Sequence, residues 1–383
     1  MHRLGIRLVV RLIPLSYLVI GCGEATGPGL STWETLYRLP NDYSEVYGVV
    51  SVRTDAPPAP SVVIAAGTDN RDRAVLLSYG YNEGRMAFAG PEGSVFEDVS
   101  ILSPGVIAVG NRAENGALKP YVVRYDRASE TAEEVPVPAL PGCTFSAAYS
   151  NAFDTAWLLL SDHAAAYYGV RAGIPVLYKE GGFSAFEQLG TVTGAYDTGT
   201  SNWVFYGLEY AGDNPVPGSL GPAYDGPAAL YITDNLGASW FNESIPSAFG
   251  GRPVHSAVLL EAVRGKLFIG VRFADGAYGV VKRTGGVGQG EYELLFLSYQ
   301  GPFFHELRAL AWRDVHTIIE YGITCDAIGV GDMTSVKYDG GGWTEEALPY
   351  PLELVDISAS YDSGFVAAGY DITYGGWALL YHP

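Results

Sequence analysis

Six acidic side chains recur at corresponding places along the chain, and they are the first candidates for chemistry. Each follows a short apolar run, and the six are Asp69, Asp162, Glu209, Asp275, Asp332 and Asp371. We interpret each as the end of the second strand of a repeated unit. If the units share one orientation, the six carboxylates form an acidic ring on one face, able to hold a cation or attract a basic partner.

Calcium is the cation that this acidic ring would suit, because calcium takes oxygen ligands from carboxylates and turn carbonyls. Few basic residues lie close to these acids in the sequence, namely Arg71, Arg73, Arg112 and Arg272. The sequence therefore predicts a negative potential over this face and stabilisation of the protein by calcium. Turn formation alone is the alternative explanation, since Asp bonds to its own backbone in turns.

The other reactive residues form no recognisable constellation in the sequence. The six histidines lack metal-ligand spacing such as two His separated by three residues. The chain also lacks a Gly-x-Ser-x-Gly elbow, a phosphate loop and a dinucleotide fingerprint. The cysteines are Cys22, Cys143 and Cys325, and spacing leaves open whether the last two pair.

The acids belong to a pattern that repeats about every 50 residues, a period typical of propellers and solenoids. In each copy a tyrosine ends a short segment, a polar or glycine-rich turn follows, and an aromatic or apolar residue opens the next segment. The clearest copy runs from Ser335 to Pro349. The tyrosine recurs as Tyr79, Tyr125, Tyr178, Tyr231, Tyr338 and Tyr381, and it is lost at 280–283.

Apolar runs upstream of each tyrosine have the composition of buried strands. Ile64–Gly67, Ile107–Gly110 and Val366–Gly369 are nearly the same sequence, and a further apolar run precedes each of them. Each unit therefore supplies four strands. In the sixth unit two segments, 315–322 and 328–331, compete for the position of the second strand.

The two ends of the chain complete one unit between them. The sequence stops soon after Tyr381, whereas Trp33 to Pro40 match the segment from Trp343 to Pro349. We expect residues 33–40 to pair with the segment around Tyr381, which closes a ring and removes free sheet edges. The predicted fold is all-β, a seven-bladed β-propeller of four-stranded blades over residues 31–383. A pair of β-sandwiches with accidental repeats is the alternative.

The stretch 231–240 resembles the Asp-box of bacterial neuraminidase-type repeat propellers. Four residues fit the pattern of that box, namely Thr233, Gly237, Ser239 and Trp240, while Asn235 replaces its aspartate. The resemblance covers one blade well, whereas the other blades share only the spacing of the repeat. In that family the box is a folding element remote from the active site, so the resemblance supports an architecture and no activity.

A second segment, Tyr37-Arg38-Leu39-Pro40, is similar to the Phe/Tyr-Arg-Ile-Pro motif of sialidases. In sialidases that arginine binds the carboxylate of sialic acid, so the resemblance implies such a role for Arg38. A structural explanation competes with it, because strands in other units also end in Leu-Pro or Ile-Pro, at 348–349 and 245–246. Sialidases are also six-bladed and carry several intact boxes.

The first residues have the pattern of a bacterial lipoprotein signal. Arg3, Arg7 and Arg11 precede an apolar run at 12–20, which is shorter than the about 20 residues of a spanning helix. Val19-Ile20-Gly21-Cys22 resembles a lipobox, whose cysteine takes diacylglycerol. We therefore expect a signal peptide at 1–22 with lipid attachment at Cys22, and a tether at 23–30. Gly23 carries no inner-membrane retention acid, so the expected location is the outer membrane.

Charge narrows the possible functions. The chain has 42 acidic and 23 basic residues and a formal net charge of −19, which argues against nucleic acid, since nucleic acid is bound by basic surfaces. The leading interpretation is a surface-anchored, non-catalytic binding or scaffolding propeller, touching the membrane only through its lipid anchor and binding a protein or a polysaccharide. The alternatives are a carbohydrate-active hydrolase or lyase with its site at the funnel mouth, and a self-associating structural surface protein.

Overall fold

The computed structural model describes residues 33–52, 62–80, 83–102, 105–136, 144–150, 156–162, 176–179, 182–185, 189–197, 202–209, 229–235, 239–263, 266–297, 304–312, 318–325, 331–338, 343–346, 348–350, 352–359 and 364–382. In β11–β13 and β23–β26 the description covers the backbone. The predicted signal peptide, Cys22 and the tether lie outside the described residues, as does Cys143. Within the described ranges, no helix is long and apolar enough to cross a membrane.

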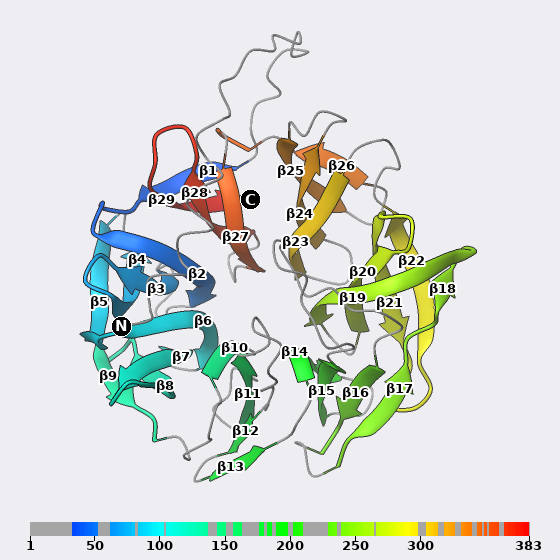
Figure 1. Cartoon of the computed structure of the whole chain (residues 1–383), viewed down its shortest axis with the longest axis horizontal. Coiled ribbons are helices and arrows are strands. Elements are labelled where there is room, and N and C mark those ends of the chain that lie inside the picture. The colour runs from blue at the N-terminus through cyan, green and yellow to red at the C-terminus, as the bar shows by residue number, and fades with distance from the viewer. Residues whose placement is uncertain are drawn as a thin grey trace, which may run out of the picture.

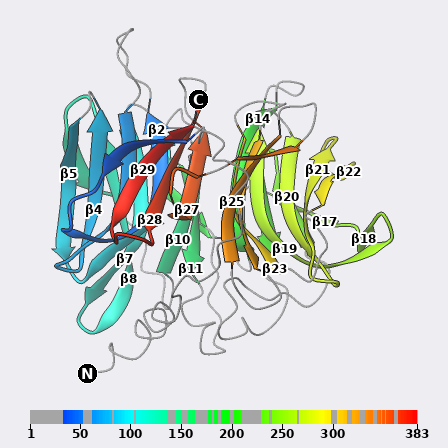
Figure 2. The same cartoon turned by 90° about the horizontal axis from the view of Figure 1, so that it is seen from above.

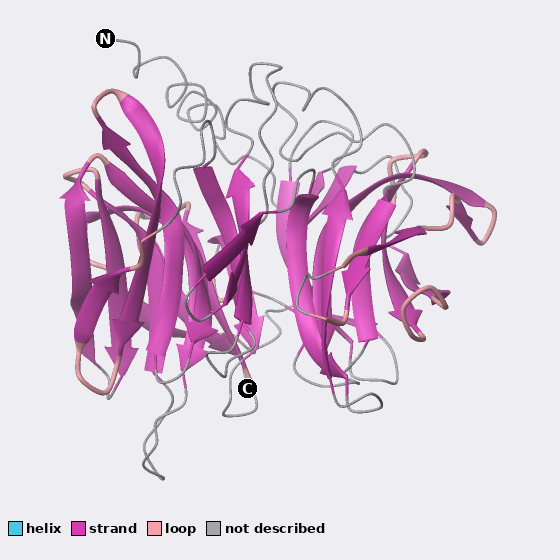
Figure 3. Ribbon diagram, turned by 90° about the horizontal axis from the view of Figure 1, so that it is seen from below, coloured by secondary structure: helices cyan, strands magenta, loops and turns pink. Residues whose placement is uncertain are grey.

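The described elements are all strands, β1 to β29, and they form seven antiparallel sheets (Figure 3). The first sheet contains β2 (Tyr43–Val52), β3 (Val62–Asp69), β4 (Arg73–Gly80) and β5 (Glu83–Glu92). The second contains β6 (Ser94–Leu102), β7 (Gly105–Glu114), β8 (Ala117–Asp126) and β9 (Thr131–Glu134). The third contains β10 (Thr144–Ser150), β11 (Ala156–Asp162), β12 (Val176–Lys179) and β13 (Gly182–Ala185).

The fourth sheet contains β14 (Leu189–Asp197), β15 (Asn202–Glu209), β16 (Ala229–Thr233) and β17 (Phe241–Ser244). The fifth sheet adds a short fifth strand, β18 (Ala248–Phe249), to β19 (Arg252–Val263), β20 (Lys266–Phe273), β21 (Tyr278–Thr284) and β22 (Glu291–Leu297). The sixth contains β23 (Phe304–Trp312), β24 (Ile318–Cys325), β25 (Gly331–Tyr338) and β26 (Trp343–Glu346). The seventh joins β27 (Leu352–Ala359), β28 (Phe365–Asp371) and β29 (Trp377–His382) to β1 (Glu34–Arg38).

The sheets are arranged around a common centre in chain order, as the colours of Figure 1 show. Seven strands, one from each sheet, form a closed series in which each contacts the next. In order they are β2, β6, β10, β14, β19, β23 and β27, and β27 contacts β2 again. We call these seven the inner strands. Figure 2, turned by 90° from Figure 1, shows the strands of neighbouring sheets side by side. This is a β-propeller arrangement, so the prediction of an all-β propeller with four-stranded sheets is confirmed.

Strand β1 closes the arrangement by joining both ends of the chain. It pairs antiparallel with β29, with Glu34 opposite Tyr381 and Arg38 opposite Ala378. The predicted pairing of 33–40 with the segment around Tyr381 is therefore confirmed. Strand β1 also packs on the first sheet, because the ring of Tyr37 stacks on that of Tyr79 with centroids 5.3 Å apart.

The repeated tyrosines share a register in most sheets, as the sequence pattern indicates. Tyr79, Tyr125, Tyr178 and Tyr381 each pair with the second residue of the second strand of their sheet. Tyr231 is an exception, because it pairs with Gly207 near the other end of β15. The assignment of Tyr231 to the tyrosine position was therefore wrong. Arg283 pairs with Leu267, the second residue of β20, and so occupies the tyrosine position in the fifth sheet.

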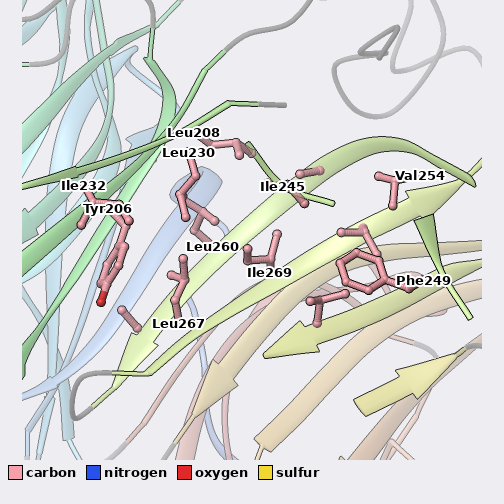
Figure 4. Close-up of a cluster of buried hydrophobic side chains, with 14 of the residues drawn as sticks. Tyr206, Leu208, Leu230, Ile232, Ile245, Phe249, Val254, Leu260, Leu267 and Ile269 are labelled. Atoms are coloured by element: carbon pink, nitrogen blue, oxygen red, sulfur yellow. The ribbon is translucent and has the colours of Figure 1, made fainter. Parts of the chain in front are cut away.

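Buried apolar side chains fill the spaces within and between sheets. The second strands are the most apolar, and every residue of β3 is buried, as expected for a strand covered on both faces. Figure 4 shows a cluster shared by the fourth and fifth sheets, in which Tyr206, Leu230 and Ile269 lie together. In the sixth sheet the second strand is β24, which settles the competition in favour of the earlier segment, shifted to 318–325.

Candidate functional site

The predicted acids lie at the same end of their sheets. Four of them end second strands and lie opposite the beginning of the first strand, in the pairs Asp69–Tyr43, Asp162–Thr144, Glu209–Leu189 and Asp371–Leu352. Asp275 lies in the turn after β20. Asp332 was misassigned, because it lies in the third strand β25, opposite Thr324. The pairing nevertheless places it near the end of β24.

Asp69 is buried, with 3% of its surface exposed, and is fully engaged by its own turn. Its Oδ1 accepts hydrogen bonds from the backbone N–H groups of Arg71 and Arg73, at 2.9 and 3.0 Å. Its Oδ2 accepts two more from the guanidinium of Arg73, at 2.9 and 2.7 Å. Burial alone would raise the pKa of Asp69, but these hydrogen bonds outweigh burial and lower that pKa.

Asp371 has the same role in the seventh sheet, with an arginine from a distant part of the chain. Its Oδ1 accepts hydrogen bonds from the backbone N–H groups of Thr373 and Tyr374, at 2.9 and 3.1 Å. Its Oδ2 lies 2.7 Å from Nη1 of Arg38, on the closing strand β1. Burial opposes ionisation of Asp371, yet the hydrogen bonds from Arg38 and the turn lower its pKa.

Asp275 is more exposed than Asp69 and Asp371, and it also pairs with an arginine. Its Oδ2 accepts a hydrogen bond of 2.8 Å from Nη1 of Arg252, at the start of β19, and its Oδ1 accepts one from the N–H of Ala277. The expectation of little basic compensation was therefore wrong for the three acids whose side chains are described. Two of their arginines, Arg38 and Arg252, are distant in sequence and become neighbours only through strand pairing.

The side chains of Asp162, Glu209 and Asp332 lie outside the described part of the structure. Within the part that is described, no group of three or more His, Cys, Asp or Glu side chains is arranged to hold a metal ion. The calcium site and the binding role of the six acids stay predictions.

A second set of carboxylates, which the sequence interpretation missed, lies on the inner strands. Asp98 is in β6, Glu261 in β19 and Asp356 in β27, and each is partly exposed. Burial raises the pKa of Asp98 to about 8, and the nearby Asp356 adds to the increase. Burial and Asp356 likewise raise the pKa of Glu261 to about 8. Burial raises the pKa of Asp356 to about 6, against hydrogen bonds from two backbone N–H groups.

Two of these inner carboxylates connect neighbouring sheets. Oδ2 of Asp98 accepts a hydrogen bond of 2.8 Å from the N–H of Ala148 in β10. Oδ2 of Asp356 accepts one of 2.7 Å from the N–H of Val49 in β2. Each carboxylate also binds the N–H of its own following residue. These bonds satisfy inner-strand donors that have no strand partner on that side, so we assign both residues a structural role.

Strand β2 has glycine where β6 and β27 have aspartate. Gly48, Asp98 and Asp356 each follow a β-bulge in the first strand of their sheet. A Cβ at Gly48 would lie 2.9 Å from Oδ1 of Asp98, so the absence of a side chain allows the two strands to approach. A sequence signal for the aspartates existed in the similar triplets Asp98-Val-Ser and Asp356-Ile-Ser.

In the segment that resembles an Asp-box, the described residues 231–235 and 239–240 are joined by side-chain hydrogen bonds. Thr233 Oγ1 donates a hydrogen bond of 2.8 Å to Oδ1 of Asn235. Oδ1 of Asn235 also accepts a hydrogen bond of 3.0 Å from the backbone N–H of Ser239, and Nδ2 of Asn235 donates one of 2.7 Å to Oγ of Ser239. The side chain of Asn235 therefore links Thr233, at the end of β16, to Ser239, shortly before β17.

The arginine that resembles the sialidase arginine is engaged by this protein's own side chains. Besides its ion pair with Asp371, the guanidinium of Arg38 lies 4.4 Å from the ring centroid of Tyr350. The hydrogen bond to Asp371 raises the pKa of Arg38, and Tyr350 and Tyr374 add to the increase. Arg38 thus fastens β1 to the turn after β28, which favours its structural explanation.

Comparisons with known proteins identify a fold but no family. No protein-family description matches the chain, and no curated protein matches it. Among solved structures, YCF48 from Cyanidioschyzon merolae is 11% identical, with a TM-score of 0.56 over 92% of this chain and 98% of that chain. A structure of YCF48 bound to D1 peptide is 12% identical, with a TM-score of 0.59 over 93% and 96%.

A chain of the mitotic checkpoint complex is 11% identical, with a TM-score of 0.53 over 94% of this chain and 98% of that chain. At such low identity these likenesses show a shared fold. They extend over nearly the whole chain, in agreement with the β-propeller arrangement.

Proposed function

We propose that this protein is a non-catalytic binding module, a seven-bladed propeller that presents a polypeptide-binding face at the second-strand ends of its sheets. The observation that supports the proposal is that the buried acids described on that face are fully occupied by hydrogen bonds within the protein. Asp69 and Asp371 are buried and use both carboxylate oxygens to hold exposed turns and to pair with arginines. A carboxylate engaged in this way fixes the shape of a surface and is poorly placed for proton transfer.

The comparison with solved propellers supports a peptide or protein as the ligand. The structure of YCF48 bound to D1 peptide has the same fold over most of both chains, and the mitotic checkpoint complex contains a further propeller within a protein assembly. Rigid surfaces bind with a smaller loss of conformational entropy than mobile ones. The fixed turns of this face suit that kind of recognition.

Export and membrane anchoring belong to the proposal as well. The lipobox at 19–22 would attach lipid to Cys22 and hold the propeller at the outer membrane, with 23–30 as a tether. A lipid chain contributes about 0.8 kcal/mol per buried CH₂. We expect Cys22→Ser to move the protein from the membrane fraction to the soluble exported fraction, and unchanged membrane retention would contradict the anchor.

The ligand class is tested by three assays on the same full-length protein. A random peptide library displayed on phage, a glycan array and a fluorogenic sialoside are each presented to it. We expect enrichment of peptides that bind with micromolar affinity, no glycan signal above background and no sialoside turnover. Glycan binding without peptide enrichment would overturn the peptide assignment, and turnover abolished by Arg38→Ala would establish the hydrolase alternative.

A further inference from the structure

The hairpin of β7 and β8 in the second sheet ends in the one Asn-Gly sequence of the chain, Asn115-Gly116. The two strands pair as far as Glu114 opposite Ala117, so these two residues alone form the loop. Their φ angles are 52° and 81°, the left-handed conformation that a two-residue loop of this kind requires and that Asn-Gly adopts readily. In Figure 2 the tip of this hairpin lies beyond the ends of β4 and β5.

The residues that suit this loop also bring two reactive groups together. The backbone nitrogen of Gly116 follows Asn115 directly, so its attack on the side-chain amide carbon of Asn115 closes a five-membered ring. Glycine carries no side chain to shield that nitrogen, and a Cβ placed on Gly116 would meet nothing within 4 Å. Among the described residues, no backbone carbonyl accepts a hydrogen bond from the N–H of Gly116. The nitrogen is therefore accessible and is not held by a strand pair.

The side chain of Asn115 is also less restrained than those of other exposed asparagines. Nδ2 of Asn70 donates a hydrogen bond to the carbonyl oxygen of Asn41. The amide of Asn235 is bonded on both sides, and its Nδ2 donates to Oγ of Ser239 at 2.7 Å. Asn115 is exposed, and within the described part of the chain no residue hydrogen-bonds to its side chain. Its amide carbon is therefore open to attack.

We propose that Asn115 is a modification site, at which the folded protein deamidates spontaneously and forms isoaspartate. The nitrogen of Gly116 bonds to Cγ of Asn115, the proton of that nitrogen passes to the side-chain nitrogen, and the bond between Cγ and that nitrogen breaks to release ammonia. Water then opens the succinimide ring at either carbonyl carbon, which gives aspartate or isoaspartate. Water is the only co-reactant, and no group is oxidised or reduced.

The fold sets both the ease and the consequence of this reaction. The loop must leave its left-handed conformation for the ring to close, and strand pairs open at the lowest free energy at an exposed hairpin end such as 115–119. Aspartate adds a negative charge next to Glu114, which already pairs with Lys119 at 2.9 Å. Isoaspartate inserts a methylene group into the backbone, so the two-residue loop that matches the twist of β7 and β8 is lost. This site does not depend on the proposed function.

The test incubates three forms of the full chain at neutral and at mildly alkaline pH, below their melting temperatures. These are the wild type, Gly116→Ala and Asn115→Ser. Gly116→Ala keeps the amide but places a methyl group beside the attacking nitrogen, whereas Asn115→Ser removes the amide. Peptide mass spectrometry after digestion at acidic pH locates each conversion of amide to acid. Enzymatic methylation by an isoaspartate methyltransferase counts the isoaspartate formed.

We expect conversion in the wild type to be fastest at Asn115 and faster at alkaline pH, because the attacking nitrogen must lose its proton. Gly116→Ala should slow it about tenfold, which corresponds to about 1.4 kcal/mol of activation free energy. Asn115→Ser should lack most of the isoaspartate. Faster conversion at another asparagine, or an intact Asn115 after prolonged incubation, would overturn the site. Equal rates in the wild type and Gly116→Ala would overturn attack by the nitrogen of Gly116.

Discussion

Two sets of carboxylates in this propeller behave in opposite ways. At the second-strand ends, Asp69 and Asp371 are buried but accept hydrogen bonds from arginines and turn N–H groups, and their pKa values are lowered. On the inner strands, Asp98 and Glu261 are partly exposed, and among the described side chains no basic residue is paired with either of them. Burial raises the pKa of both to about 8.

The opposite pKa shifts of the two sets show that burial alone does not set the charge of a carboxylate. What decides it is the balance between burial and the groups around the oxygens: Asp69 and Asp371 bond to an arginine as well as to N–H groups, whereas Asp98 accepts N–H groups alone. The outer acids are charged and hold turns in shape, whereas the inner acids are largely neutral at moderate acidity. The pKa values thus favour the ionised form of Asp69 and Asp371 at neutral pH and the protonated form of Asp98 and Glu261 below about pH 8.

The largest expected effect comes from the most deeply buried arginine–carboxylate pair. Arg283 is 1% exposed and makes two 2.7 Å hydrogen bonds to Glu243 of the neighbouring sheet. Arg283→Ala should lower the free energy of unfolding by about 3–5 kcal/mol, because it leaves the carboxylate of Glu243 buried without a cation. Urea denaturation measures the loss.

Lys282→Ala is the matched control for that variant, because Lys282 pairs with the exposed Glu293 on the neighbouring strand. Its loss should be about 1 kcal/mol or less. Similar losses for the two variants would contradict the claim that desolvation separates buried from exposed pairs in this fold.

An intermediate effect is expected at the closing strand. Asp371→Ala removes the partner of Arg38 and the acceptor of two turn N–H groups, so we expect a loss of about 2–4 kcal/mol. Asp275→Ala removes a more exposed pair with Arg252 and should cost about 1 kcal/mol or less. If both variants unfold at the same urea concentration, Asp371 does not fasten β1 as described.

Much of the architecture could be predicted from the sequence, because it depends on local patterns. The runs Ile64–Gly67 and Val366–Gly369 form buried second strands, and residues 33–40 match the strand that the last sheet lacks. Local similarity misled in the fourth sheet, where Tyr231 pairs with Gly207. A tyrosine near the end of an apolar run has the same local pattern in either register.

The chemistry of the acids was less predictable, because it depends on contacts between distant residues. Arg38 precedes Asp371 by 333 positions, and the two meet only because β1 pairs with β29. The pKa values of Asp98 and Glu261 are raised by burial and by Asp356, which lies on another strand distant in sequence, so no local pattern shows them. The repeated Asp-Val-Ser and Asp-Ile-Ser triplets were the available signal for Asp98 and Asp356.

The smallest effect in this series concerns calcium. If the six second-strand acids bind calcium, millimolar calcium should add about 1 kcal/mol or less to the free energy of unfolding, since three of them are already paired with arginines. The double variant Asp332→Asn with Asp371→Asn should reduce the gain in melting temperature. A wild-type melting curve that is indifferent to calcium would leave turn formation as the explanation of these acids.

The most direct test of the contrast between the two sets is the pH dependence of unfolding in Glu261→Gln and Asp371→Asn. Because the pKa of Glu261 is raised on folding, the folded state binds more protons, and its stability falls as pH rises from about 4 to about 8. Because the pKa of Asp371 is lowered, its contribution is present above about pH 4 and is lost on further acidification.

Melting temperatures of the wild type and both variants across this range supply the measurement. We predict that Glu261→Gln matches the wild type near pH 4 and is more stable near pH 8. Asp371→Asn should be less stable than the wild type at neutral pH, and the difference should shrink as the pH falls below about 4. Parallel profiles for all three proteins would contradict the account, because the two sets of carboxylates would then not differ in charge.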